Sequence, residues 1–335
     1  MVNLSQKRID EIFSKLKDKK IAVIGDLMID RYFLGTVARL SPEAPVPVVE
    51  VKEESNRLGG AANVANNIAS LGGIPMMIGV AGNDQGAVLL KTLVEERGFL
   101  STGIVLDPKR PTTVKSRVIA HNQHVVRIDQ EDKTEINKAI QEKIILFVQE
   151  NIGAIDGIIL EDYNKGVLTR NLVREIIDIG RRHKKVITVD PKFNNFFDYI
   201  DVTVFKPNRK ESEEALGRRL QSIEEAEKAA REIQQRLHAE NVLLTMSEEG
   251  MLLIEQSGES SHVATMARKV ADVSGAGDTV IATLTMALVS GATVREAAAL
   301  ANIAGGIVCG EVGIVPIDSA VLRTTASDVF NGERQ

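Results

Sequence analysis

The sequence has a single cysteine and no long apolar run, and both absences restrict what the protein can be. Cys309 stands alone among 335 residues, so no internal disulfide can form, which fits a reducing compartment. Its apolar surroundings, residues 304–312, favour a buried, inert thiol over a nucleophile. No apolar run approaches the roughly 18 residues of a membrane span, and the polar N-terminus does not resemble a signal peptide. We therefore expect a cytoplasmic protein without membrane contact.

An excess of positive charge is also lacking. The chain has 41 basic and 46 acidic residues, a net charge of −5, which excludes a basic field for nucleic acid. With 44% hydrophobic and 26% charged residues, the composition is that of an ordinary globular protein able to bury a large core. Residues 1–335 are expected to form one domain.

Several common cofactor motifs are missing. No G-x-x-x-x-G-K-[ST] loop is present, so the chain is not a P-loop enzyme. No G-x-G-x-x-G follows the first apolar run, which weakens a dinucleotide-binding interpretation, and no cysteine and histidine spacing suits zinc.

What is present is an alternation of strand-like and helix-like patterns. Short, uniformly apolar runs are typical of strands covered on both faces, and they occur at residues 21–26, 157–160, 186–189, 202–205, 242–246 and 251–254. Helical patterns lie between and after them, at residues 60–71, 85–96, 134–151, 169–183, 222–238, 278–289 and 295–308. This alternation predicts an α/β fold with a mostly parallel central sheet and helices on both faces.

Two segments interrupt that order. Residues 32–58 and 110–130 contain alternating β-branched and polar residues typical of antiparallel strands. We expect them to form a small antiparallel β flap, or lid, that closes over a ligand and excludes water. The alternative is a decorated edge of the main sheet.

The stretch from Val273 to Val280 combines small residues with a carboxylate. Gly275, Ala276 and Gly277 leave backbone N–H groups uncovered at the start of a helix, where anions bind. Asp278 would repel a phosphate at that place. The combination makes sense if a proton is removed beside a phosphate.

Polar residues also follow the predicted strands, where ligands bind in open α/β sheets. They are Asp26, Asp30, Glu161, Asp162, Tyr163, Asp190, Lys192, Lys206, Asn208, Glu211 and Ser247. Each alone could be a helix cap. The Gly59-Gly60 pair opens a helix of small residues, which indicates either tight packing or, with Asn63, contact with substrate hydroxyls.

Five separated motifs carry a resemblance to a known family. They are GDLMIDRY at 25–32, SPEAPVPV at 41–48, GGAANVA at 59–65, DPK at 190–192 and DVSGAGDT at 272–279. The chain resembles the ribokinase/PfkB sugar-kinase superfamily, and within it the D-glycero-β-D-manno-heptose 7-phosphate kinases of ADP-heptose (lipopolysaccharide core) synthesis. The resemblance implies a ribokinase-like three-layer fold and ATP-dependent phosphorylation of the heptose 7-phosphate at the anomeric O1. The bifunctional members carry a further cytidylyltransferase-like domain, so the kinase-only form is expected here.

The resemblance also implies residue roles. Asp278 would be the base, and the backbone N–H groups of Gly275, Ala276 and Gly277 would stabilise the moving phosphoryl group. Asn208 and Glu211 resemble the superfamily's magnesium motif, with Glu211 acting through metal-bound water. Residues that would contact ATP are Thr245, Ser247, Gly250 and Asn302. Asp272 and Ser274 occupy the place of a monovalent-cation (K⁺) site.

On the sugar side, the implied ligands are Asp26, Asp30, Gly59, Gly60, Asn63 and Lys192. The 7-phosphate requires cations, and we expect them among Arg39, Arg117 and Arg127 of the lid. Outward apolar residues on the lid, Val46, Val48 and Val118, predict a homodimer. Two alternatives remain open: a ribose- or fructose-type sugar kinase, and a non-catalytic nucleotide- or sugar-binding regulator.

Overall fold

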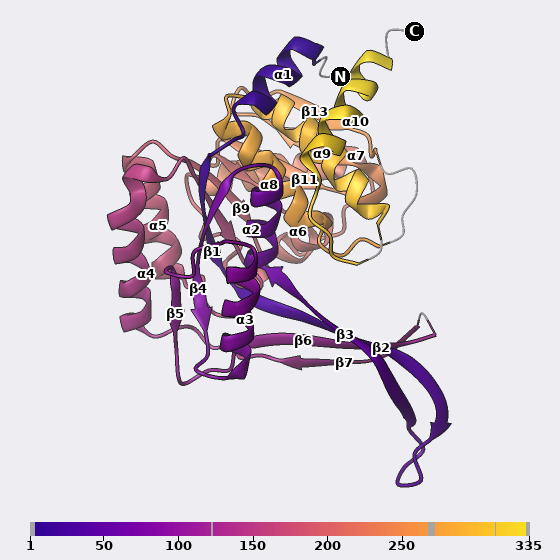
Figure 1. Ribbon diagram of the computed structural model, residues 1–335. Coiled ribbons are helices and arrows are strands. Elements are labelled where there is room, and N and C mark those ends of the chain that lie inside the picture. Colours follow the sequence, from indigo (N-terminus) through magenta and orange to yellow (C-terminus); the bar gives the residue numbers. More distant parts are fainter. Residues whose placement is uncertain (1–3, 122, 267–271, 312, 333–335) are drawn as a thin grey trace.

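The computed structural model describes residues 4–121, 123–266, 272–311 and 313–332, which form two sheets and their covering helices (Figure 1). The main sheet has nine strands in this described part, in the order β13-β12-β11-β10-β9-β8-β1-β4-β5. Its strands are β1 Lys20–Gly25, β4 Ile74–Ala81, β5 Ile104–Leu106, β8 Gly157–Glu161, β9 Val186–Asp190, β10 Val204–Phe205, β11 Asn241–Thr245, β12 Met251–Ile254 and β13 Ser260–Val263. All neighbours pair in parallel except β11 with β12 and β12 with β13. The predicted mostly parallel sheet is confirmed.

Helices cover both faces of this sheet. They are α1 Gln6–Ser14, α2 Ala61–Ser70, α3 Gln85–Glu96, α4 Lys138–Asn151, α5 Arg170–Arg182, α6 Arg209–Leu216, α7 Ile223–Leu237, α8 Ala276–Val289, α9 Val294–Cys309 and α10 Ser319–Gly332. Neighbouring residues of β1 enter different cores: Ile21 and Val23 pack with α2, α8 and α9, whereas Ala22 and Ile24 pack with α4, α5 and α7. The alternation of side chains along a strand produces this division. The three-layer prediction is confirmed.

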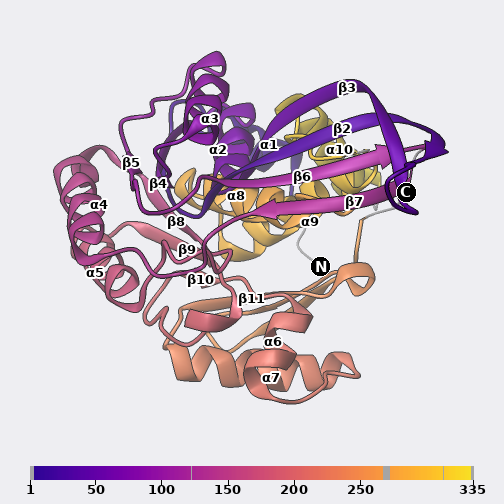
Figure 2. The same cartoon turned by 90° about the horizontal axis from the view of Figure 1, so that it is seen from below.

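A separate four-stranded sheet, the lid, has the order β3-β2-β6-β7. Its strands are β2 Leu27–Leu40, β3 Pro47–Gly60, β6 Thr113–Ala120 and β7 Gln123–Gln130. Figures 1 and 2 show these strands side by side, running away from the body of the molecule. The lid is therefore not a decorated edge of the main sheet.

Two details of the lid differ from the expectation. The pairs β2–β3 and β6–β7 are antiparallel, but β2 and β6 join them in parallel. The first segment is also longer than residues 32–58, because Leu27–Asp30 already pair with residues 57–60 and are buried. These buried residues anchor the lid in the body.

α8 is a buried helix that packs against one face of the main sheet. All its residues from Asp278 to Ala287 are buried, and it contacts α2, α9, β8 and β9. This segment has no solvent-facing side, whereas Ala276 and Gly277 of the first turn are not buried. No helix in the described ranges is both long and apolar enough to cross a membrane.

Candidate active site

A cavity of about 500 Å³ opens at the carboxyl ends of the parallel strands β9, β10 and β11. Its walls contain polar residues from the strand ends, the first turn of α8 and residues of α9. The lining residues that the sequence singled out are Tyr163, Asp190, Lys192, Lys206, Asn208, Thr245, Ser247, Gly250, Gly275, Ala276, Gly277, Asp278 and Asn302. The prediction that ligands bind at this edge of the sheet matches the position of the cavity.

The first turn of α8 depends on a glycine. Gly275 is the N-cap with φ +79°, a left-handed conformation that a residue with a side chain rarely adopts. It provides no capping side chain, so no side-chain oxygen covers the helix start. The Ala276 N–H donates to Val273 O at 3.3 Å, and Gly275, Ala276, Gly277 and Asp278 line the cavity.

Asp278 is the buried carboxylate of this turn, only 4% exposed. Its Oδ2 accepts from Asn63 Nδ2 at 2.7 Å, and its Oδ1 accepts from the Tyr163 hydroxyl at 2.7 Å. Burial raises the pKa of Asp278 to about 6, although both of these hydrogen bonds lower it. Both donors fix the carboxylate, and it remains mostly ionised near neutral pH.

Glu161 and Asp190 lie beside Asp278. One oxygen from each of the three carboxylates can be chosen so that all lie within 4.8 Å of one another. Asp190 Oδ2 pairs with Lys206 Nζ at 2.8 Å, whereas neither oxygen of Glu161 has a hydrogen-bond partner in the described chain. Burial, and then the charges of Asp190 and Asp278, raise the pKa of Glu161 well above its usual range. Oxygen donors of this kind suit a hard divalent cation.

Asn208 and Glu211 form the capping box of α6. Asn208 Oδ1 accepts from the Glu211 N–H, and Glu211 Oε2 accepts from the Asn208 N–H, each at 2.8 Å. Glu211 Oε1 pairs with Lys192 Nζ at 2.5 Å. Burial lowers the pKa of Lys192, but the carboxylates of Asp190 and Glu211 outweigh it, so the net shift is upward. Both oxygens of Glu211 are thus engaged within the chain.

The residues expected at the nucleotide all line the cavity. Gly250 has φ +84°, and a Cβ there would lie 2.1 Å from Val263 O, so only glycine fits. Asn302 donates to Ala264 O at 2.7 Å, which connects α9 to the turn after β13. Thr245 and Ser247 stand at the end of β11. The four residues expected to contact ATP are therefore together.

On the sugar side, the structure separates two aspartates that the sequence grouped. Asp26 is buried, and its oxygens accept from the backbone N–H groups of Tyr163, Lys165 and Val167 at 2.8, 3.1 and 3.2 Å. It fastens the loop after β8 and is absent from the cavity lining. Asp30 is also buried, and its Oδ1 pairs with Arg117 Nη1 at 2.5 Å.

Gly59 and Gly60 lie at the base of the lid next to these aspartates. A Cβ on Gly59 would lie 2.1 Å from Asp30 Oδ2, and one on Gly60 would lie 2.5 Å from Asp26 O. This close approach explains the pair without any ligand. Asn63, one turn later, reaches Asp278 directly.

The three lid arginines lie in different surroundings. Arg117 lies near the base of the lid, with its guanidinium 5.3 Å from the centre of the Tyr32 ring. Arg127 pairs with Asp129 at 2.6 Å and is exposed. Arg39 is exposed near the β2–β3 tip, beyond the last residue that β6 pairs, so it is not close to Asp278 in this chain.

Asp272 and Ser274 form a turn before α8. Asp272 Oδ1 accepts from the Ser274 N–H at 2.9 Å, and Oδ2 accepts from the Gly313 N–H at 3.1 Å. Burial raises the pKa of Asp272, but these hydrogen bonds lower it more. The carboxylate is thus ionised, and it joins two loops next to the site.

Tyr163 and Lys115 are residues whose contacts the sequence did not reveal. Tyr163 was expected only as a polar residue after a strand, yet its hydroxyl donates a hydrogen bond to Asp278. The ammonium groups of Lys115 and Lys192 each lie 5.3 Å from the centre of its ring. The sequence signal that could have identified Tyr163 as a site residue was its position just after β8. Lys115 had none, because it lies in the middle of a lid strand.

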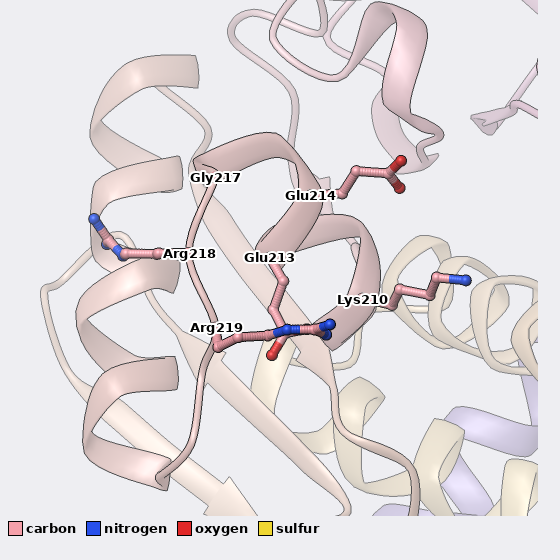
Figure 3. A pocket seen from close by; sticks show the side chains of 6 residues that line it. All are labelled: Lys210, Glu213, Glu214, Gly217, Arg218 and Arg219. Carbon is pink, nitrogen blue, oxygen red and sulfur yellow. The ribbon is translucent and has the colours of Figure 1, made fainter.

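A second cavity, of about 390 Å³, lies beside α6 (Figure 3). Its charged walls are partly neutralised, since Arg219 pairs with Glu213 at 2.8 Å and Arg218 with Glu232 at 2.6 Å. None of its lining residues borders the larger cavity. We assign no chemistry to it.

Comparisons with known proteins agree with this geometry. The sequence profile of the pfkB family carbohydrate kinases matches residues 18–319. A curated relative, the bifunctional protein HldE of Helicobacter pylori (strain J99 / ATCC 700824), is 45% identical over 296 residues, covering 88% of this chain and 64% of the relative. HldE of Desulfatibacillum aliphaticivorans is 42% identical over 309 residues, covering 92% and 63%. The chain thus spans somewhat less than two thirds of the length of these relatives.

Solved structures show the same fold. Phosphofructokinase-2 from Escherichia coli in complex with potassium superposes with a TM-score of 0.74 at 18% identity, covering 94% of this chain and 99% of that one. Arabidopsis thaliana ribokinase complexed with ribose and ATP gives 0.71 at 17% identity, covering 92% and 98%.

Proposed function

Because this chain belongs to the pfkB family of carbohydrate kinases, we propose that it transfers the γ-phosphoryl group of ATP to O1 of D-glycero-β-D-manno-heptose 7-phosphate. The product would be the 1,7-bisphosphate, an intermediate towards ADP-heptose and the lipopolysaccharide core. The observation that carries this proposal is Asp278, a fixed buried carboxylate beside uncovered backbone N–H groups in the wall of a cavity. A protein that only binds ligands has no need of a base there.

Asp278 accepts the proton of the anomeric hydroxyl. As the bond between O1 and the γ-phosphorus forms, the bond between that phosphorus and the ADP oxygen breaks, and the proton moves to the carboxylate. A pKa of about 6 leaves the base ionised near neutral pH without making it too weak to take the proton. The N–H groups at the start of α8 then stabilise the charge on the transferred group.

The nucleotide lies along the wall formed by Thr245, Ser247, Gly250 and Asn302, with its phosphates towards α8. Mg²⁺ fits the oxygen donors of Glu161 and Asp190, and Glu211 reaches it through water. The bound ion would neutralise charge on the phosphates. K⁺ would lie near Asp272 and Ser274, whose turn adjoins this wall.

The sugar lies between this site and the lid, and the whole chain works as one kinase unit with the lid over its acceptor. Asn63 and Lys192 face it from the body, and Asp30, Gly59 and Gly60 form the base of the lid. Asp26 acts indirectly, by holding the loop that carries Tyr163.

We also propose that two copies associate through the outer face of the lid. Val126 and Ile128, on the outward side of β7, are 48% and 56% exposed, and Val118 pairs with Val126. Apolar residues in such an exposed sheet are usually covered by a partner.

A screen of ADP release with purified protein tests the reaction. The acceptors are heptose 7-phosphate, the free heptose, ribose, fructose and fructose 6-phosphate, each with ATP and Mg²⁺. We expect the largest kcat/KM with heptose 7-phosphate. Preference for ribose or a fructose would reject the substrate, and binding of ATP and sugar without ADP release would favour the regulator.

A further inference from the structure

The inner face of the lid carries several cations, and one of them, Lys115, contacts the Tyr163 side chain that holds Asp278. Lys115 of β6 aligns with Asp30 on β2 and Asp129 on β7, and Arg117 aligns with Tyr32 and Arg127. Because side chains alternate along a strand, residues 115 and 117 share one face. This face is turned to the site, since Lys115 Nζ lies 5.3 Å from the centre of the Tyr163 ring.

The neighbouring cations are already neutralised. Arg117 pairs with Asp30 at 2.5 Å, and Arg127 with Asp129 at 2.6 Å. Lys165 pairs with Glu131, also at 2.6 Å.

Lys115 is different. Within the described ranges of the chain, no carboxylate oxygen lies within 4.0 Å of its ammonium, although the residue is half-buried. Burial, followed by the charges of Lys165 and Arg127, lowers the pKa of Lys115, and Asp30 offsets this only in part. A half-buried ammonium without a counterion is costly, and an anion bound beside it removes that cost.

Tyr163 connects this ammonium to the base. Its hydroxyl donates to Asp278, and the ammonium of Lys115 lies over its ring, so both groups contact one side chain. A sugar with its O1 at Asp278 would extend along Tyr163 towards the lid. The end of the sugar away from O1 would then approach Lys115.

We propose that Lys115 binds the phosphate that the acceptor sugar already carries and so selects sugar phosphates over free sugars. This inference rests on the proposed function. Arg117 and Arg127 do not contact this phosphate and instead neutralise the charges of Asp30 and Asp129.

The test replaces Lys115 with methionine, which keeps the length of the side chain and removes the charge. We expect the KM for heptose 7-phosphate to rise about 10- to 100-fold, as for loss of a charge-assisted hydrogen bond. The KM for ATP and the kinetics with free heptose should stay the same. Lys115→Arg should retain most of the preference, and Lys115→Gln gives the same test if Lys115→Met does not fold.

Lys52→Met is the matched control, because Lys52 is an exposed lid lysine that pairs with Glu50 at 3.6 Å. It should leave every constant unchanged. An unaltered preference in Lys115→Met, or an equal loss with free and phosphorylated heptose, overturns this inference alone. A wild type without preference for phosphorylated acceptors overturns the proposed substrate as well.

Discussion

At the scale of single residues, the site is organised by Tyr163. Its hydroxyl fixes Asp278, its backbone N–H donates to Asp26, and the ammonium groups of two lysines each lie 5.3 Å from its ring centre. A carboxylate that accepts two hydrogen bonds at 2.7 Å cannot rotate freely, so its orientation towards the acceptor is set before the substrate binds.

Tyr163→Phe should change the pH dependence of the reaction. With the pKa of Asp278 at about 6, kcat/KM of the wild type should rise as pH increases through that value, because only the ionised base accepts a proton. The tyrosine hydroxyl lowers this pKa, so its removal should shift the acid limb to higher pH. We expect kcat to fall about tenfold.

Tyr199→Phe is the control for this measurement. Tyr199 is fully buried, and its hydroxyl donates to Asp162 at 2.7 Å instead of Asp278. Its removal should leave the acid limb in place. If the acid limb shifts equally in both variants, the shift reflects a general loss of stability and Tyr163 has no special role.

Residue types at strand ends could be predicted, but their contacts could not. The sequence indicated that Asp26 and Asp278 would lie at one edge of the sheet. It could not show that the Asp26 carboxylate accepts hydrogen bonds from three backbone N–H groups, because these belong to residues more than a hundred positions away. Lys115 escaped notice for the same reason, because only the three-dimensional structure shows that no carboxylate of the described residues pairs with it.

At the scale of elements, two helix starts form the site by different means. α8 begins with a glycine and no side-chain cap, which leaves its N–H groups to the ligand. α6 begins with a complete capping box, and the same Glu211 that closes it also holds Lys192. α6 therefore links helix stability to the proposed metal site.

Asn208→Ala should affect both stability and catalysis. Loss of the cap costs about 1 kcal/mol, a fall in Tm of roughly 2–4 °C. The displaced Glu211 should also raise the concentration of Mg²⁺ needed for half-maximal activity. Thermal unfolding and Mg²⁺ titration of the ADP-release rate measure the two effects.

Thr293→Ala is the matched control, because Thr293 and Glu296 form the equivalent capping box of α9. It should lower Tm by a similar amount and leave the Mg²⁺ dependence unchanged. Equal Mg²⁺ dependence in the two variants would contradict a role for α6 in metal binding.

Elements with a clear period were predictable, and those with interrupting residues were not. The runs that became β1, β8, β9, β11 and β12 are continuous and apolar, so their strands were expected. β4 was missed, because Pro75 and Gly79 interrupt its apolar run. Its pairing with β1 in the sheet overrides these local preferences.

At the scale of the whole molecule, the lid is the part that this single chain leaves uncovered. Its inner face carries cations, while Val126 and Ile128 on the outer face are exposed. The three-layer body does not need a partner to cover its sheet, because helices cover both faces. The sequence indicated the body from its alternating pattern, but the parallel joining of β2 and β6 required long-range contacts.

Val126→Asp should convert the proposed dimer into a monomer. A charge in an apolar interface remains unpaired and desolvated, which costs several kcal/mol. Sedimentation equilibrium should give twice the chain mass for the wild type and the chain mass for the variant. Val88→Asp, at an exposed valine of α3, should remain dimeric; a monomeric wild type would refute the lid interface.

The central claim is that Asp278 is the base, and the turnover of Asp278→Asn tests it most directly. The amide keeps the shape of the side chain but cannot take the proton. We expect kcat for heptose 7-phosphate to fall about 10²- to 10⁴-fold. ATP should bind as tightly as before or more tightly, because a negative charge beside its phosphates is gone. Turnover within about tenfold of the wild type, with ATP binding intact, would contradict the account.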